Sequence, residues 1–406
     1  MNLSEVTADY QSLPSHSNDI ECDQLHVQSP PLSTCELCVI VPVQNEAETL
    51  YKTLDALANQ VDLQGNPFHP CRYEIILFAN NCSDSSAAIA YHFAATHPEL
   101  ALHVVERNLA PKDAYIGRVR QLLMHEAYRR FARLEKKRGV IASTDGDSMV
   151  DSTWIAATLR EVEQGADAIG GRILISKEER SALDPYARAC YLREVGYQYL
   201  LGKLEAILDP DPFDRLPRHH QHYGASLAVT AEMYAQAGGM PAVRTPEDVA
   251  FYRALLRVGA RFHHSPHVRV TTSARQIGRA TNGLANQLNQ WVMMGKQQQP
   301  FLVEDVSAVE TRLKIRYALR KLRSRIVHAE YQLTALDTEM LSSKLGVENS
   351  WLTYELKNPQ PFNLFLERIE QRQREEGQWK PQRFSVKIEQ ALSDLRLRLY
   401  TLQKTS

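Results

Sequence analysis

The strongest constraint on the fold is an alternation of short apolar runs with longer helical patterns between residues 37 and 175. Short runs rich in β-branched residues predict strands, and the longer amphipathic stretches predict helices. The expected strands are 37–43, 73–79, 102–106, 139–144 and 168–175, and the expected helices are 47–60, 85–97, 116–137 and 153–164. Because such alternation implies right-handed crossovers, we expect an α/β fold with a mostly parallel sheet flanked by helices.

Length and charge bound the organisation of the chain. Its 406 residues suffice for two or three units, which we take as a polar N-terminal tail (1–34), an α/β domain (35–300) and a helical C-terminal region (301–406). A net charge of -1 argues against a nucleic-acid binder. The sequence shows neither an apolar run of about 18 residues nor the features of a signal peptide, so no transmembrane segment and a cytoplasmic location are expected.

Two carboxylates, Asp145 and Asp147, directly follow the fourth expected strand. In a parallel sheet the loops beyond the carboxyl ends of the strands hold the ligand. Two carboxylates this close repel each other unless a cation lies beside them, and hard oxygen ligands suit Mg²⁺ or Mn²⁺ together with substrate phosphates. The alternative is a polar turn in which Asp147 or Asp151 caps the helix that begins near Thr153.

Five motifs occur in an order that is typical of one family. They are Val39–Glu46 (VIVPVQNE), Phe78–Asp84 (FANNCSD), Thr144–Asp147 (TDGD), Tyr223–Val229 (YGASLAV) with Ala237–Gly239 (AGG), and Thr245–Asp248 (TPED) with the helix Phe251–Gly259. Over about residues 37–290 the chain resembles a family 2 glycosyltransferase of the GT-A fold. The missing membrane span makes it similar to the soluble members rather than to the membrane-embedded polymer synthases.

The resemblance implies transfer of a sugar from a nucleotide-diphosphate-sugar donor to the hydroxyl of an acceptor that the sequence does not identify. It implies a metal ion, Mg²⁺ or Mn²⁺, bound by Asp147 with Asp145, and an inverting reaction with Asp248 as general base and Glu247 as second choice. The donor-binding residues that it implies are Pro42, Asn45, Glu46, Asn80, Asn81, Asp84, Lys112, Arg118 and Asp145. Asn80 stands where many relatives have an acidic residue. An amide can both donate and accept, so the sequence does not decide which nucleotide base is recognised.

Three alternatives to this mechanism remain. Glu247 and Asp248 could serve only the first turn of a helix, where acidic residues are favourable. The enzyme could be a retaining GT-A transferase that makes a small glycoside such as a sugar–glycerate, without Asp248 as base. The chain could also be a non-catalytic protein that binds nucleotide sugars.

Basic and histidine residues outside the motifs allow more than one interpretation. Lys112, Arg118 and Arg120 follow the third strand and form either a diphosphate clamp or part of a helix surface. His263, His264 and His267 follow the Glu-Asp helix, and the sequence does not decide which of them, if any, adds a metal ligand. Arg275 ends a strand-like run and could line the cleft of the same site.

The C-terminal region predicts helices with apolar seams. One seam runs from Ile315 to Leu336 and another from Ile388 to Leu402, so these helices would pack on one another or on a second copy of the chain in a homodimer. The stretch 312–325 carries seven positive charges, which would suit peripheral contact with an anionic membrane. The favoured interpretation is a solvated polar face, because acidic residues flank the stretch.

Overall fold

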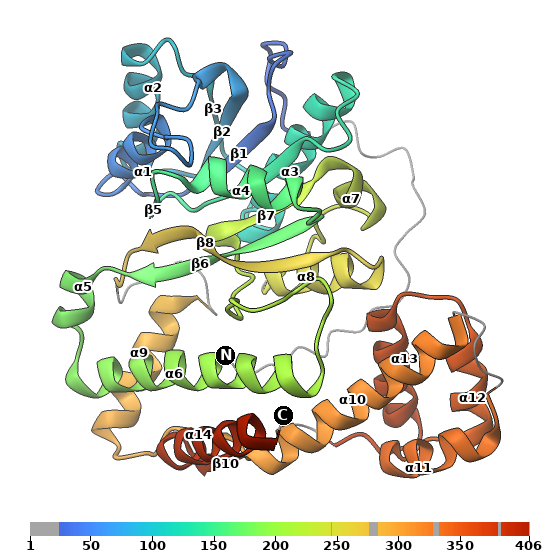
Figure 1. Ribbon diagram of the computed structural model, residues 1–406. Coiled ribbons are helices and arrows are strands. Elements are labelled where there is room, and N and C mark those ends of the chain that lie inside the picture. The colour runs from blue at the N-terminus through green and yellow to red at the C-terminus, as the bar shows by residue number, and fades with distance from the viewer. Residues whose placement is uncertain (1–23, 245, 276–282, 328–332, 381–382, 406) are drawn as a thin grey trace.

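The computed structural model describes residues 24–244, 246–275, 283–327, 333–380 and 383–405 (Figure 1). Within these residues one sheet of eight strands has the order β3-β2-β1-β4-β7-β6-β8-β5. The strands are β1 (Leu37–Val43), β2 (Tyr73–Asn80), β3 (Leu102–Arg107), β4 (Val140–Ser143), β5 (Ser148–Val150), β6 (Ala168–Ile175), β7 (Leu227–Thr230) and β8 (Phe262–Thr272). Only β7 and β5 run against the others, so the expected α/β fold with a mostly parallel sheet is confirmed.

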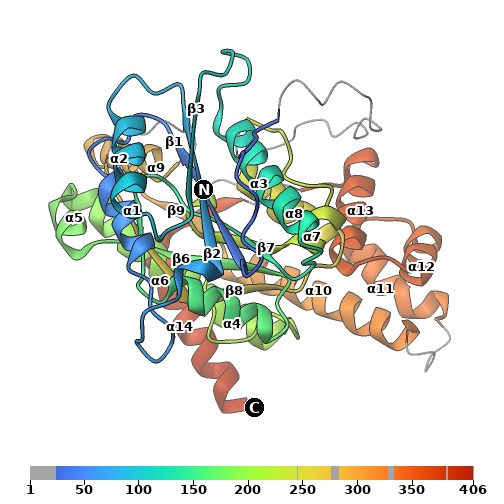
Figure 2. The same ribbon diagram turned by 90° about the horizontal axis from the view of Figure 1, so that it is seen from above.

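Helices cover both faces of the sheet, and further helices form a layer below it (Figures 1 and 2). They are α1 (Leu50–Ala58), α2 (Ser86–Thr96), α3 (Ile116–Arg133), α4 (Trp154–Glu163), α5 (Lys177–Ala182), α6 (Pro185–Leu208), α7 (Ala231–Gln236), α8 (Glu247–Arg257), α9 (Leu284–Lys296), α10 (Val306–Val327), α11 (Ala335–Leu345), α12 (Asn349–Lys357), α13 (Phe362–Glu375) and α14 (Ile388–Thr405). Short 3₁₀ turns, η2 (Pro70–Arg72) and η3 (Gly224–Ser226), precede β2 and β7, and β9 (Leu302–Glu304) pairs with β10 (Phe384–Lys387).

The sheet has a separate apolar core on each face. Alternate residues of β1 point to opposite faces, so Val39 packs in the core with α1, α2 and α4, whereas Ile40 packs in the core with α3, α7 and α8. All seven residues of β1 are therefore buried, as expected of a central strand covered on both faces. Because both faces of the strand are covered, its sequence is a continuous apolar run without polar alternation.

Pro42 marks the place where the sheet opens. It pairs with Phe78 of β2 on one side, but the pairing of β1 with β4 ends at Ile40 and Ser143. A proline has no N–H to give to a ladder, so it fits a strand edge that has lost its neighbour. Beyond Ser143 the chain leaves β1 and forms the turn that carries the acidic pair.

The predicted N-terminal tail divides into two parts. Residues 1–23 lie outside the described residues, and residues 24–34 lie against α3. Leu25 and Val27 are buried in the same core as α3, and Arg130 donates to the carbonyl oxygens of Ser29 and Pro30. The division at residue 34 stays a prediction.

The C-terminal region has two apolar clusters. One joins α6 with the first half of α10 and the α14 seam, and the other joins the second half of α10 with α11, α12 and α13. The predicted α14 seam is buried within the chain from Ile388 to Leu399. The predicted seam from Ile315 to Leu336 is wrong at its end, because Leu336 is 80 % exposed. Ala329 of this seam lies outside the described residues.

The basic stretch 312–325 lies on α10 and pairs inside the molecule. Arg312 contacts Glu304, and Arg316 and Arg320 both contact the buried Asp209 at the end of α6. Arg323 is buried and donates to the carbonyl oxygen of Asn358. Internal partners thus account for these charges. Among the described residues, none of the helices combines the length and apolarity needed to cross a membrane.

Candidate active site

The acidic pair lies in a short turn between β4 and β5. Asp145 and Asp147 flank Gly146, whose carbonyl oxygen accepts from Thr53 of α1 at 3.1 Å and from Thr49 at 3.3 Å. Ser148, the next residue, donates from its hydroxyl to that of Thr272 in β8 at 3.0 Å. The turn is therefore fixed from two sides, by α1 and by β8.

Capping of the next helix does not explain the acidic pair. The N-cap of α4 is Thr153, and no side chain caps this helix. Asp151 instead pairs with Arg269 at 2.9 Å. Both carboxylates of the pair therefore lie apart from the α4 terminus.

Arg275 pairs with the second carboxylate of the turn. Its guanidinium lies 2.9 Å from Asp147, and it donates to both oxygens of Glu46 at 2.6 and 2.9 Å. Burial, with the neighbouring charge of Asp145, raises the pKa of Asp147 to about 6. A cation beside Asp147 favours the charged carboxylate, and here the guanidinium supplies that cation.

Arg120 joins the two predicted acidic motifs. One terminal nitrogen donates to Asp145 at 2.6 Å, and the other contacts Glu247. The side chain is only 3 % exposed. A Cβ atom at Gly224 would overlap the guanidinium, so this glycine leaves the space that Arg120 occupies.

Glu247 and Asp248 begin α8 and differ in their surroundings. Glu247 is buried, and burial raises its pKa to about 7 although Arg120 lies beside it. Asp248 is partly buried and accepts from the backbone N–H of Gly224 at 3.0 Å and of Val249 at 2.8 Å; burial raises its pKa too. Asp248 thus serves the first turn of α8, as the capping alternative expects, and also reaches across to Gly224. Thr245 of this motif lies outside the described residues.

Three predicted donor-binding residues hold the loops after β1, β2 and β3 together. Asn45 accepts from the backbone of Ser83 at 2.7 Å, and Asp84 accepts from the backbone of Ala47 at 3.0 Å. Asn81 exchanges two hydrogen bonds with the backbone of Leu109, at 2.9 and 3.0 Å. Asn45 and Asn81 have φ values of 56° and 50°, a left-handed conformation that asparagine tolerates better than most residues. These side chains therefore fix the rim of the predicted nucleotide site.

Three buried polar atoms at the carboxyl ends of β2 and β4 have no hydrogen-bond partner within the described residues. They are Asn80 Oδ1, Ser143 Oγ and Thr144 Oγ1. An unsatisfied buried polar atom costs about 1–3 kcal/mol, and such groups gather where a ligand completes the bonding. Pro42 of β1 pairs with Phe78 of β2, and the pairing of β1 with β4 ends at Ser143, so three strands meet at this point.

The structure gives Lys112 and Arg118 other surroundings. Lys112 is exposed in the loop before α3, and its carbonyl oxygen accepts from Arg244. Arg118 donates to Gln121 at 2.5 Å on α3. Residues two apart on a helix point in nearly opposite directions, so Arg120 reaches the acidic groups while Arg118 lies on another side of α3. Their donor-binding role stays a prediction.

His222, which lies before η3, meets the histidines of β8. His264 bonds Asp214 at 2.8 Å, His263 lies 3.4 Å from the same carboxylate, and His222 contacts His264 at 3.4 Å. Within the described residues no three His, Cys, Asp or Glu side chains form a group that could hold a metal. The choice among His263, His264 and His267 as metal ligand stays open.

Two residues of the site were left out of the sequence-based set. Arg120 was considered with the basic loop, and Arg275 only as part of the cleft wall. The helical phase of α3 distinguishes Arg120 from Arg118, but only the fold shows which face meets the acidic turn. Arg275 lies 229 positions from Glu46, and no local pattern reveals that contact.

The donor set of the turn fits a divalent ion that a substrate completes. Asp145 and Asp147 offer carboxylate oxygens, and Mg²⁺ in particular is usually held by one or two carboxylates plus substrate phosphates. The side chain of Asp145 is 33 % exposed, so the turn is reached from solvent. The chemistry of these residues agrees with such an ion.

Comparisons with known proteins connect this architecture to glycosyltransferases. The family model "Glycosyl transferase family 2" matches residues 38–212. Glycosyltransferase AglE of Haloferax volcanii is 24 % identical over 137 residues, which are 33 % of this chain and 38 % of that protein. The chain thus matches well under half of the length of this relative.

Two solved structures are similar over most of the chain. One is the mannosyltransferase PcManGT from Pyrobaculum calidifontis in complex with GDP-Man and Mn²⁺, with 15 % identity, a TM-score of 0.42, and 93 % of this chain and 90 % of that chain covered. The other is S. aureus TarS 1–349 in complex with UDP-GlcNAc, with 11 % identity, a TM-score of 0.42, and 86 % and 97 % covered.

The matched segment contains β1, the loops after β2 and β3, Arg120 and the acidic turn. Glu247, Asp248 and Arg275 lie beyond it, so the match does not cover them. The resemblance drawn from the five motifs is confirmed over residues 38–212, the segment that matches the family 2 glycosyltransferase model.

Proposed function

We propose that this protein transfers a sugar from a nucleotide-diphosphate-sugar donor to an acceptor hydroxyl. The donor lies against the loops after β1, β2 and β4, with Asp147 and Asp145 holding a divalent cation, Mg²⁺ or Mn²⁺. Asp248 is the general base, which makes the reaction inverting, and Glu247 assists it.

One observation carries this proposal. Arg120 contacts Asp145 and Glu247 at the same time, so the predicted metal site and the predicted base motif lie within the span of one guanidinium. Two motifs that are distant in the sequence thus form a single site. Were the Glu-Asp motif only a helix terminus, nothing would require its first residue to share a buried arginine with the acidic turn.

Each part of the site has a chemical task. When bound, the divalent ion neutralises the charge that develops on the departing nucleoside diphosphate. Asn80 Oδ1, which has no hydrogen-bond partner in the part of the chain that the structure describes, can accept from a base or ribose of the donor. Asp248 must take the proton of the attacking hydroxyl, and its raised pKa makes it a stronger base than an ordinary aspartate.

Thermal shifts with a panel of UDP- and GDP-sugars, each with Mg²⁺ or Mn²⁺, test the donor. A ligand at one hundred times its Kd stabilises the fold by about 2.7 kcal/mol. Asp147→Asn is expected to remove the shift and to lower turnover by about 100-fold or more. Asp151→Asn is the matched control, because Asp151 follows the same turn but pairs with Arg269, and it should leave both unchanged.

The outcomes separate the inverting reaction from the retaining and the non-catalytic alternatives. A shift without sugar transfer to any acceptor would favour a nucleotide-sugar-binding protein without catalysis. Transfer with retention at the anomeric carbon would remove Asp248 as base and favour the retaining reaction. Absence of a shift with every donor, or wild-type turnover of Asp147→Asn, would contradict the proposed function.

A further inference from the structure

Arg275 is bound to the acidic turn by contacts that the transfer reaction does not explain. Its guanidinium lies between Glu46 of the β1 loop and Asp147 of the turn, with three nitrogen–oxygen distances of 2.6 to 2.9 Å. Asp147 is the carboxylate that the proposed function gives to the divalent cation. In this structure a side-chain cation lies beside that carboxylate.

We propose that Arg275 is an exchangeable counter-ion of the acidic turn, which opposes metal binding until the nucleotide donor arrives and then passes to the donor diphosphate. The inference rests on the proposed function, since it assumes that a nucleoside diphosphate binds at this turn. It goes beyond that function by giving the site an order of binding.

The charge balance around the turn supports the exchange. Glu46, Asp145 and Asp147 are three carboxylates, and two guanidinium groups, Arg120 and Arg275, lie against them. A divalent ion that binds Asp147 with Arg275 in place brings two more positive charges next to a guanidinium. The ion and Arg275 therefore compete for the same carboxylate oxygens.

The donor resolves this competition. A diphosphate brings negative charge and a row of oxygens to the turn, and a guanidinium matches phosphate oxygens with two parallel hydrogen bonds. Arg275 can therefore leave Asp147 for the diphosphate without losing an ionic partner. Metal and donor then bind together more tightly than either binds alone.

The position of Arg275 permits such a movement. Its side chain is 30 % exposed, and it follows the last residue of β8, Thr272, by three positions. The side chain of Glu46 is only 9 % exposed, so it is the fixed end of the contact. A partly exposed guanidinium exchanges partners at low cost, because solvent screens each ion pair that it leaves.

Arg275→Gln tests the inference through binding rather than turnover. Binding of Mn²⁺ alone is followed by electron paramagnetic resonance of the free ion, and binding of UDP and of GDP by calorimetry at saturating Mn²⁺. We expect Mn²⁺ alone to bind about tenfold more tightly than to the wild type, and the nucleoside diphosphate about tenfold more weakly. The two changes have opposite signs, which a loss of folding cannot produce.

Two further variants keep the test sharp. Arg275→Lys retains the charge without the forked geometry, so its Mn²⁺ affinity should stay close to that of the wild type while diphosphate binding falls. Arg269→Gln is the matched control: this arginine lies on β8 and pairs with Asp151 at 2.9 Å, and its replacement should change neither affinity.

The results distinguish this inference from the proposed function. If the wild type binds no nucleoside diphosphate with Mn²⁺, the proposed function fails. If the wild type binds normally but Arg275→Gln binds Mn²⁺ alone no more tightly, or keeps full diphosphate affinity, the counter-ion role is overturned and the proposed function stands.

Discussion

Two arginines neutralise carboxylates of the site, and the surroundings of their side chains differ. Arg120 bridges Asp145 and Glu247 from α3, and Arg275 bridges Glu46 and Asp147 from the end of β8. The first side chain is 3 % exposed and the second 30 %. The same functional group thus meets two carboxylates in each case, with very different access to water.

Burial decides what each arginine can do. Arg120 is buried and pairs with the buried Glu247, so it cannot leave without uncovering a charge in the interior. Unpaired buried charges are costly, whereas ion pairs near water contribute little and exchange easily. We therefore regard Arg120 as a permanent part of the fold and Arg275 as the cation that substrates replace.

The largest expected effect concerns the base on the Arg120 side of the site. Asp248→Asn keeps an acceptor for the N–H of Gly224 but cannot take a proton at neutral pH, so kcat is expected to fall by about 10²- to 10⁴-fold. Donor binding, measured by calorimetry, should change little. A larger loss of kcat in Glu247→Gln than in Asp248→Asn would make Glu247 the base instead.

Replacement of Arg120 should affect the stability of the fold more than the activity. At a pH above about 7, where Glu247 is charged, Arg120→Met leaves this carboxylate buried without its cation, which costs about 3–5 kcal/mol in the free energy of unfolding measured by urea denaturation. The double variant R120M/E247Q should recover part of this loss, because no buried charge remains unpaired. Arg118→Met, two positions away on α3, is the control and should change stability by less than about 0.5 kcal/mol.

Equal stability of Arg120→Met and Arg118→Met would show that Arg120 is no more fixed than Arg275. The contrast between the two arginines would then be wrong, whatever the activity of the variants.

The protonation of Glu247 gives a dependence on pH. Its pKa is raised from 4.5 to about 7, so the fold favours the neutral acid. The resulting stabilisation is fully present below the unfolded pKa and is lost as pH rises through about 7. Glu247→Gln imitates the neutral acid at every pH. Its stability relative to wild type should therefore increase between pH 4.5 and 7.5, by on the order of 3 kcal/mol in unfolding experiments.

A constant difference between Glu247→Gln and wild type over this range would contradict the raised pKa. It would mean that Arg120 keeps Glu247 charged at all pH values where the protein folds.

The sequence predicted the sheet where the signal was local. The runs 37–43 and 168–175 became β1 and β6 without change, and β1, which is buried on both faces, is a continuous apolar run. The expected helix 47–60 begins later, at Leu50, after a turn in which the N–H of Thr49 donates to the carbonyl oxygen of Glu46. β7 was not predicted, and its antiparallel place between β4 and β6 depends on pairing over long separations.

The same limit applies to the site. Asp145 and Asp147 were found because they follow a strand directly, and the turn was where they were expected. The contacts that join them to Glu247 and Glu46 run through Arg120 and Arg275, and these cross 127 and 229 positions of the chain. Residue type and spacing identified the carboxylates, but only the fold shows which cations meet them.

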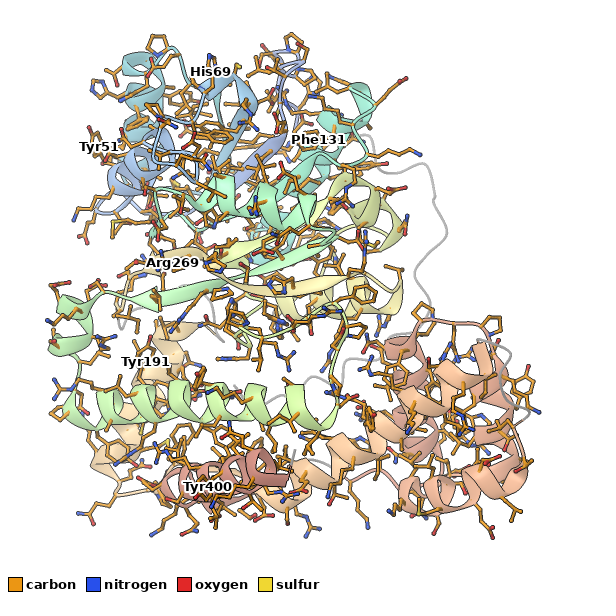
Figure 3. All side chains as sticks on the ribbon, in the orientation of Figure 1. Tyr51, His69, Phe131, Tyr191, Arg269 and Tyr400 are labelled. Atoms are coloured by element: carbon orange, nitrogen blue, oxygen red, sulfur yellow. The ribbon has the colours of Figure 1, made fainter. Side chains whose placement is uncertain are left out.

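The smallest predicted effect concerns the backbone that holds the acidic turn for Arg275. Thr53 of α1 is buried and donates to the carbonyl oxygen of Gly146 at 3.1 Å, with Thr49 as second donor at 3.3 Å (Figure 3 shows the side chains around α1). Thr53→Val keeps the shape and removes one donor, which should cost about 1 kcal/mol of stability. Thr53→Ser retains the hydroxyl and serves as control.

The binding of Mn²⁺ with UDP or GDP tests the same contact. If the turn is as firmly placed as Arg120 and only Arg275 is exchangeable, Thr53→Val should weaken this binding, whereas Thr53→Ser should not. An unchanged affinity in Thr53→Val would show that the turn keeps its place without the hydrogen bond from Thr53.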